Sequence, residues 1–187
     1  MARDSIARLT GKNFLDVKIS RAENGKPFYK NFDGQEIFFS LSHSGPWVVC
    51  SLGDRPNGVD VETKQNQIGL VIAKRFFLPN EYEALKSLND SGKDWRRKFL
   101  QYWTLKEAAL KCFDLASWTE VDCEKFLSGK ENAARACCFD LPDGGVISVV
   151  SELTTPSGSL RSPLPLYLKA TPPAFQATSP YTGEARV

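Results

Sequence analysis

The alternation of apolar and polar residues predicts a helix and a series of short strands in the first third of the chain. Residues 6–9 begin a helical pattern, and residues 14–20 (FLDVKIS) alternate as a half-buried strand does. Residues 36–44 (EIFFSLSHS) predict a strand that runs into small polar residues. The uniformly apolar residues 47–53 (WVVCSLG) predict a buried strand. Residues 22–29 (AENGKPFY) hold Asn-Gly and Pro, which predict a turn.

Helical periodicity dominates the middle of the chain. Residues 66–88 predict two helical pieces that break at Pro79, because proline cannot continue a helix. Residues 89–94 (NDSGKD) predict a loop. Apolar residues then recur at helical spacing from Trp95 to Phe113, which predicts one long helix.

The last third predicts a hairpin followed by a change in composition. Residues 134–152 predict two strands around a Pro-Asp-Gly-Gly turn. The segment after residue 154 holds six of the eleven prolines and few charges. Such sequence rarely builds a core, so it predicts a tail or an extended strap rather than a folded subdomain.

Composition and charge limit the classes of function. The 187 residues suffice for one or two small cores, and 24 basic against 22 acidic residues argue against a dedicated nucleic-acid binder. No apolar run approaches the roughly 20 residues that span a bilayer. The first residues lack the apolar core of a signal peptide. We therefore expect a cytoplasmic protein with neither a membrane nor a nucleic acid as its partner.

The cysteines and the histidine exclude two kinds of site. The five cysteines form no CxxC pair, and two of them are adjacent, so neither a disulfide framework nor a zinc site is indicated. Free and mostly buried thiols are expected. The single histidine, His43, excludes a histidine-rich metal site.

The stretch NGVDVET places two carboxylates, Asp60 and Glu62, on the same side of a predicted strand. Two like charges repel at this distance, and their burial costs several kcal/mol unless a positive charge neutralises them. Two interpretations are open. The strand is a solvated sheet edge with its valines facing the core, or its carboxylates bind a divalent cation.

A third carboxylate lies in the long helix, within WTLKEAALK. Glu107 and Lys111 are four residues apart and share a face, which alone indicates a surface ion pair worth a few tenths of a kcal/mol. Trp103 lies one turn earlier on that face, and Lys106 lies at its edge. Magnesium prefers carboxylate and phosphate oxygens, so Glu107 and the two strand carboxylates suggest chemistry at a phosphoryl group.

These stretches resemble a known family. GVDVE, followed about forty residues later by WTLKEAALK, resembles the two signature motifs of the 4′-phosphopantetheinyl transferases. These enzymes move the phosphopantetheine arm of coenzyme A onto a serine of a carrier protein. Three further stretches resemble the family in the same order: NGKPFY, FFSLSHSGPWVVCSL and IAKRFFLPNEYEAL. Glu62 and the histidine strand resemble the surfactin-type branch rather than the trimeric holo-acyl-carrier-protein synthase branch.

The resemblance implies an α+β fold, a pseudo-dimer of two similar halves with the active site between them. Residues 1–57 would form the first half, residues 58–154 the second half with both motifs, and residues 155–187 the proline-rich tail. The first half is short for this branch, so we expect a compact protein or a chain that begins late. Family members carry basic residues in the preceding segment that hold the 3′-phosphate, and Arg3 and Arg8 are candidate remnants. A monomer is expected, because both halves lie in one chain.

The resemblance also implies roles for individual residues. Asp60, Glu62 and Glu107 would bind magnesium, and Glu107 would also take the proton from the carrier serine. Contacts with coenzyme A are implied for Gly25, Lys26 and Pro27 at the nucleotide end and for Ser42, His43, Lys106 and Lys111 at the phosphates. Lys111 and His43 would have catalytic roles there. Arg75 and Phe76 would touch the acidic carrier, and Trp103 is expected in the core beside the site.

The implied function is magnesium-dependent transfer of phosphopantetheine from coenzyme A to a carrier protein, with release of 3′,5′-ADP. Fatty-acid, polyketide and nonribosomal-peptide carriers all remain open as partners. One alternative is a non-catalytic protein that binds coenzyme A or a carrier. Another is a different magnesium-dependent phosphodiesterase, which would not account for the glycine-lysine-proline and serine-histidine stretches.

Overall fold

A computed structural model describes residues 1–23, 25–30, 34, 36–63, 69–88, 92–131 and 134–153, and the backbone of residues 167–171 and 185–186. Its helices are α1 (Ala2–Thr10), α2 (Leu70–Phe76), α3 (Pro79–Lys86), α4 (Lys93–Phe113) and α5 (Cys123–Leu127). Its strands are β1 (Ser20–Arg21), β2 (Pro27–Lys30), β3 (Glu36–Ser44), β4 (Trp47–Gly53), β5 (Asn57–Glu62), β6 (Ala134–Asp140), β7 (Val146–Glu152), β8 (Tyr167–Thr171) and β9 (Ala185–Arg186).

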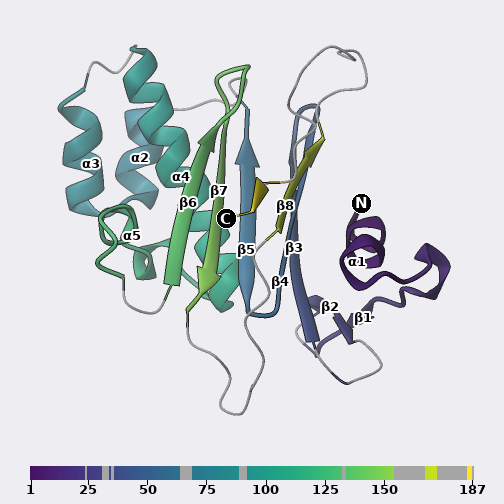
Figure 1. Cartoon of the computed structure of the whole chain (residues 1–187). Helices are drawn as coiled ribbons and strands as arrows, with labels where there is room; N and C mark the ends of the chain where they lie inside the picture. Colours follow the sequence, from purple (N-terminus) through teal and green to yellow (C-terminus); the bar gives the residue numbers. More distant parts are fainter. Residues whose placement is uncertain are drawn as a thin grey trace.

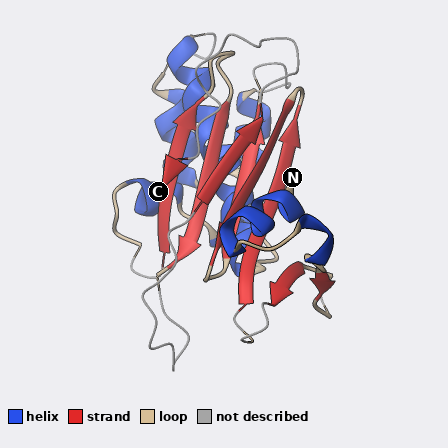
Figure 2. Cartoon of the chain, turned by 45° about the vertical axis from the view of Figure 1, so that its right-hand side comes forward, coloured by secondary structure: helices blue, strands red, loops and turns tan. Residues whose placement is uncertain are grey.

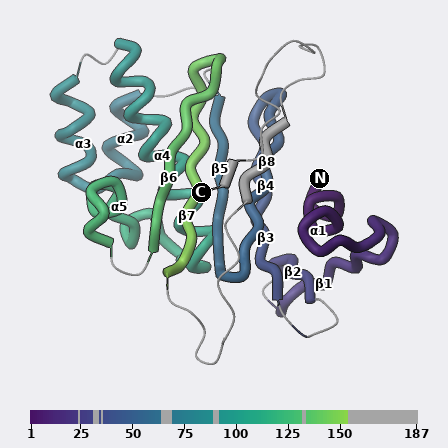
Figure 3. Tube along the Cα trace, in the orientation of Figure 1, coloured from purple at the N-terminus to yellow at the C-terminus, as the bar shows by residue number. Residues whose placement is uncertain are grey.

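The strands form two antiparallel sheets that lie between helices (Figure 1). One sheet has the order β1-β2-β3-β4-β8-β9, and the other has the order β5-β7-β6. Helices α2 to α5 cover the outer side of the β5-β7-β6 sheet, whereas α1 lies against the larger sheet (Figures 2 and 3). The predicted α+β class is therefore confirmed.

Three apolar clusters hold these layers together. The largest joins α4 to α2, α3, α5 and the strands β6 and β7, and a second packs α1 on the larger sheet. The third lies between the sheets, where Trp47 and Val49 of β4 meet Val59 and Val61 of β5. The two valines of the GVDVE stretch thus face the core, as the sequence predicted.

The strand predicted over residues 14–20 is wrong for most of its length. Phe14–Asp16 form a 3₁₀ turn, because the Asn13 side chain accepts a hydrogen bond of 2.9 Å from the Leu15 amide. Leu15 is 78% exposed, and strand pairing begins only at β1. A local cap therefore overrides the alternating pattern.

The helical predictions are confirmed where the structure describes them. Helix α2 ends at Phe76, and Pro79 occupies the first turn of α3. The long helix α4 ends at Phe113, and the next residue, Asp114, adopts the left-handed conformation with φ of 53°. Residues 66–68 and 89–91 of the predicted helix and loop lie outside the described residues, and the rest of that loop already belongs to the start of α4.

Several elements were not predicted from periodicity. The segment after α4 forms a 3₁₀ turn, Trp118–Glu120, and the short helix α5. The proline-rich segment was expected as a tail or a strap; in its described part, β8 is an integral strand of the larger sheet, paired with β4. Strand β9 pairs with β8, and the rest of that segment lies outside the described residues.

Two expectations concern the whole described chain. All five cysteines are free, with three buried and two half-buried, as predicted. In the part of the chain that the structure describes, no helix combines the length and apolar character needed to cross a membrane.

Candidate active site

Backbone contact between β5 and α4 brings the signature residues together. A Cβ atom added at Gly58 would lie 2.0 Å from the Ala108 carbonyl oxygen and 2.8 Å from the Cys112 amide nitrogen. Real Cβ atoms do not approach backbone so closely, so only glycine permits this contact. The contact brings the carboxylates of β5 up against the side chains of α4.

Asp60 lies at the centre of the site and is only 5% exposed. Its Oδ1 atom accepts hydrogen bonds from Lys111 Nζ at 2.8 Å and from Ser42 Oγ at 2.7 Å. Its Oδ2 atom is buried without a hydrogen-bond partner. Burial raises the pKa of Asp60, and the charge of Lys111 and these hydrogen bonds offset that rise only in part.

Glu107 is half-buried on α4, one turn before Lys111. Burial is the main cause that raises the pKa of Glu107, followed by the negative charges of Asp60 and Glu62, while Lys111 opposes them. Glu62 is half-buried too and accepts a hydrogen bond of 2.9 Å from Ser44 Oγ. The three predicted carboxylates therefore lie close enough for their charges to interact.

These residues fit a magnesium ion that is shared with a phosphate. Among the described residues, no three acidic, histidine or cysteine side chains lie close enough together to hold a metal by themselves. Magnesium needs only one or two carboxylates when phosphate oxygens and waters complete its shell. The Oδ2 atom of Asp60, buried without a hydrogen-bond partner, is an acceptor that a bound cation would satisfy.

Lys111 pairs with a different carboxylate from the one its helical spacing suggests. Its ammonium lies 2.8 Å from Asp60 and 3.2 Å from the Val59 carbonyl, and no ion pair joins it to Glu107 among the described residues. The buried Asp60 carboxylate attracts the lysine more strongly than the half-exposed Glu107 does. Lys111 remains 32% exposed, which leaves part of its side chain open to a ligand.

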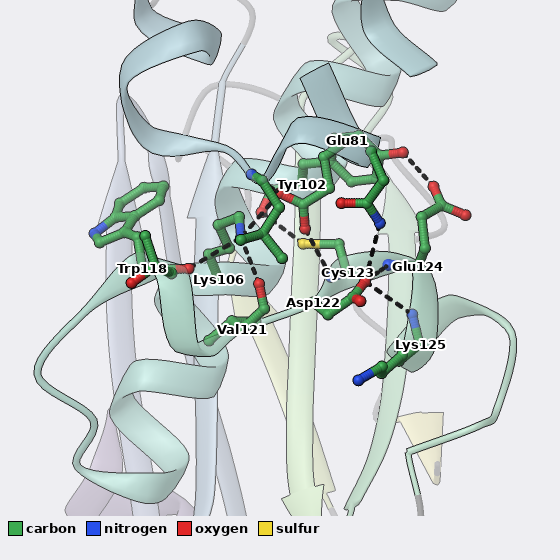
Figure 4. A network of polar contacts seen from close by, with 12 residues as sticks. Glu81, Tyr102, Lys106, Trp118, Val121, Asp122, Cys123, Glu124 and Lys125 are labelled. Atoms are coloured by element: carbon green, nitrogen blue, oxygen red, sulfur yellow. Dashed lines mark hydrogen bonds and ion pairs between the residues drawn. The ribbon is translucent and has the colours of Figure 1, made fainter. Parts of the chain in front are cut away.

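The expected phosphate contact by Lys106 is wrong. The side chain is completely buried, and its ammonium lies 2.9 Å from Glu81 Oε2 (Figure 4). It also donates to the carbonyls of Trp118 and Val121. Each step along a helix turns by about 100°, so the neighbour of Glu107 points into the core. Lys106 therefore stabilises the fold rather than contacting a ligand.

His43 is not brought together with the acidic residues. Ser42 faces β5, so strand alternation places its neighbour His43 on the opposite face of β3, where it is exposed. Phe39 lies on that same face and packs in the cluster with α1. A histidine contact at the Asp60 cluster is therefore not supported by this geometry.

Lys26 is held at the C-terminal end of α4. Its ammonium donates to the Lys111 carbonyl at 2.6 Å and lies 3.0 Å from Asp114 Oδ1. Gly25 precedes it with φ of 82°, in the left-handed region that glycine tolerates best, and Pro27 starts β2. The glycine-lysine-proline turn thus connects the larger sheet to the helix that carries Glu107.

A cavity of about 670 Å³ opens beside this turn. Lys26 and Arg21 contribute positive charge to its lining, and Phe28, Phe38 and Phe113 contribute aromatic rings. Four acidic residues also line it: Glu23, Glu36, Asp114 and Glu152. Arg3 and Arg8, the candidate remnants of a phosphate site, are both exposed on α1. Neither residue lines this cavity. The volume lies within the range of small-molecule sites.

Aromatic side chains flank the other end of the site. Trp103 is half-buried, as expected, and its ring lies 4.4 Å from that of Trp118 and 5.9 Å from that of Phe76. The guanidinium of the exposed Arg75 lies 5.3 Å from the centre of the Phe76 ring. Phe76 is thus partly committed to the core, whereas Arg75 is available at the surface.

Two residues that hold the site in place were not predicted from the sequence: Glu81, the partner of Lys106, and Ser44, the partner of Glu62. Glu81 was not singled out, although its position as the third residue of a helix, three after the N-cap Leu78, is a signal for a capping residue. Its Oε2 atom accepts the Leu78 amide at 2.8 Å, and its Oε1 atom accepts the Cys123 amide at 2.8 Å. Ser44 was also missed, although its spacing of two from Ser42 places both on one face of the strand.

Comparison with known proteins places these motifs in a family. The family model of the 4′-phosphopantetheinyl transferase superfamily matches residues 56–150. The chain is 37% identical over 112 residues to 4′-phosphopantetheinyl transferase Sfp of Bacillus subtilis. The matched region covers 59% of this chain and 47% of Sfp. It is 38% identical over 96 residues to 4′-phosphopantetheinyl transferase gsp of Aneurinibacillus migulanus, and this match covers 51% of this chain and 38% of gsp. It is 42% identical over 98 residues to 4′-phosphopantetheinyl transferase HetI of Nostoc, and this match covers 51% of this chain and 40% of HetI. The chain spans about half the length of these curated relatives or less.

Proposed function

Because the chain belongs to the 4′-phosphopantetheinyl transferase superfamily, we propose that it transfers the phosphopantetheine arm of coenzyme A to a carrier-protein serine and releases 3′,5′-ADP. The observation that carries the proposal is the meeting of Asp60, Glu62 and Glu107 with Lys111 at one place, where the charges of the three acids interact. Relatives of the surfactin-type branch, among them Sfp, bear the name of this activity.

The residues of the cluster suit the two ends of the reaction. Magnesium shared between the carboxylates of Asp60, Glu62 and Glu107 and the phosphate oxygens would neutralise charge on the pyrophosphate. Lys111 supplies a further positive charge beside Asp60 for the phosphate oxygens. Glu107, half-buried on α4 beside the other acids, takes the proton of the attacking serine hydroxyl, directly or through a water.

The cavity beside the glycine-lysine-proline turn accommodates the nucleotide end of coenzyme A. Its phenylalanines offer surfaces for the adenine ring. Lys26 is paired with Asp114, and the acidic residues of the lining outnumber Arg21 and Lys26, so the support for this placement is aromatic rather than electrostatic. The cavity is also lined by Cys112, the residue after Lys111. A coenzyme bound there can therefore extend along α4 toward the acidic cluster.

We further propose that the two sheets correspond to the two halves of a pseudo-dimer, divided near Gly58, with β8 and β9 from the segment after residue 154 added to the sheet of the first half. Each half consists of antiparallel strands with helices on its outer side: α1 on the larger sheet and α4 on the smaller one. The acidic cluster lies where β3 of the first half meets β5 of the second. This arrangement agrees with an active site between the halves.

The proposal is tested by thermal unfolding with coenzyme A and magnesium. Coenzyme A at about 100 times its dissociation constant should stabilise the fold by about 2.7 kcal/mol. For a chain of this size the midpoint should rise by roughly 5–10 °C. EDTA should reduce this shift, because magnesium links the pyrophosphate to the carboxylates. A shift produced by magnesium alone, with none added by coenzyme A, would favour a different phosphodiesterase.

Arg75 is proposed to contact the acidic carrier. Reversing its charge with Arg75→Glu should raise the KM for the carrier about tenfold, with the KM for coenzyme A unchanged, because only one substrate meets this surface. Lys130→Glu makes the same charge change at an exposed lysine after α5. Steady-state kinetics with both substrates varied would separate the effects. An unchanged carrier KM in Arg75→Glu, or an equal rise in Lys130→Glu, would contradict this contact.

A further inference from the structure

The free edge of β5 is joined to β3 by serine hydroxyls. β5 is an edge strand of its sheet, and the backbone N–H groups on such an edge have no strand partner. Serines at every second position of β3 accept hydrogen bonds from alternate amides of β5 and of the residue that follows it. Ser40 accepts from Val59 at 3.2 Å, Ser42 from Val61 at 3.4 Å and Ser44 from Thr63 at 3.3 Å. We call these three residues the serine row.

Two members of the serine row also bind carboxylates. Ser42 donates its hydroxyl proton to Asp60 at 2.7 Å, and Ser44 donates its proton to Glu62 at 2.9 Å. Each of these carboxylates belongs to the residue just before the amide that the same serine accepts. At the corresponding place opposite Ser40 the strand has Gly58, which carries no side chain.

A hydroxyl held in this way is fixed in orientation. It accepts a backbone amide of β5 and must therefore point its single proton elsewhere, and Ser42 and Ser44 point it at a carboxylate. The carboxylate is in turn restricted to one side-chain conformation. Residues that donate hydrogen bonds to the ligands of a metal ion restrict the orientation of those ligands in the same manner.

We propose that Ser42 and Ser44 are positioning residues, which hold Asp60 and Glu62 in the orientation that receives a divalent cation with the coenzyme A pyrophosphate. This inference rests on the proposed function and changes the role of Ser42. Its proton is directed to Asp60, so Ser42 acts on the phosphates through the carboxylate. Ser40 only accepts a hydrogen bond from a backbone amide at the edge of β5 and has no carboxylate opposite it.

The serine row supplies its own matched control. Ser44→Ala removes one hydroxyl that binds an amide and a carboxylate, whereas Ser40→Ala removes one that binds an amide and faces Gly58. Both variants should lower the thermal midpoint by similar amounts. Only Ser44→Ala should weaken divalent-cation binding, by about 10-fold to 100-fold. Ser44→Thr keeps the hydroxyl and should restore wild-type affinity.

The measurement is the binding of Mn²⁺ in the presence of coenzyme A, followed by electron paramagnetic resonance of the free ion. This readout does not depend on transfer activity. Equal Mn²⁺ affinity in the Ser40→Ala and Ser44→Ala proteins would overturn the positioning role and leave the proposed function intact. If the wild-type protein bound no Mn²⁺ beyond the amount that coenzyme A binds alone, the proposed function would fail, and the positioning role with it. Ser42→Ala provides a second test at Asp60, with weakened Mn²⁺ binding expected and unchanged binding contradicting the inference.

Discussion

Replacing Asp60 with asparagine is expected to lower phosphopantetheine transfer about 10³-fold without unfolding the protein. Electrostatic groups at a reacting centre are commonly worth 10²-fold to 10³-fold in rate, and Asp60 combines the unpartnered Oδ2 atom with the Lys111 contact. The fold should be preserved, because burial raises the pKa of Asp60. Folding therefore favours the neutral form of the side chain, and a neutral amide of the same shape is tolerated.

The same pKa shift determines how stability should change with pH. A carboxyl group whose pKa is raised in the folded state contributes stability below its unfolded pKa, and this contribution is lost as pH rises through the folded pKa. Asp60→Asn should remove this dependence, so its thermal midpoint at neutral pH should equal or exceed that of the wild type in the absence of metal.

Glu62→Gln serves as the comparison for Asp60→Asn. Glu62 is more exposed, and water can share its role, so its loss should be milder. Initial rates of transfer at several magnesium concentrations would measure both variants. A wild-type rate for Asp60→Asn at ordinary magnesium would remove Asp60 from the site, and an equal loss in both variants would contradict the ranking.

Lys106→Met should cause the largest loss of stability among single substitutions near the site, about 3–5 kcal/mol. Removing one member of a buried ion pair leaves the other charge uncompensated, which costs this amount. Lys106 and Glu81 are both completely buried, and Glu81 must stay in place because it accepts the amides of Leu78 and Cys123. Urea unfolding would measure the change.

Two controls isolate the buried charge as the cause. Lys86→Met breaks a pair with Glu83 in which the side chains are 57% and 65% exposed, and it should have almost no effect. The double variant Lys106→Met/Glu81→Gln removes both charges but keeps only one of the two oxygens that accept the amides of Leu78 and Cys123, so it should recover only part of the loss. If Lys106→Met cost no more than Lys86→Met, the buried pair would not stabilise the fold as described.

Much of the fold could be predicted because local signals agree with tertiary structure there. Helix α4 shows its apolar period over its whole length, and the Pro-Asp-Gly-Gly turn marks the hairpin of β6 and β7. The acidic residues were found for a similar reason. Asp60 and Glu62 share a face by strand periodicity alone, and Glu107 lies in the long helix that packs on that strand.

The remaining features depend on contacts between residues distant in sequence. Lys106 and Glu107 are neighbours in the chain, yet only the packing of α4 determines which of them faces the site. His43 and Ser42 are separated in the same way by the two faces of β3. Strand β8 was missed because its pairing with β4 is a contact between residues distant in sequence, which the composition of the segment does not indicate.

The most direct test of the account is intact mass spectrometry of an apo acyl carrier protein incubated with this protein, coenzyme A and magnesium. We expect the carrier to gain the mass of one phosphopantetheine, and we expect the gain to disappear with EDTA and to form about 10³-fold more slowly with Asp60→Asn. No gain on fatty-acid, polyketide or nonribosomal-peptide carriers, while coenzyme A still binds, would contradict the proposed transfer. The chain would then be a protein that binds coenzyme A without turnover.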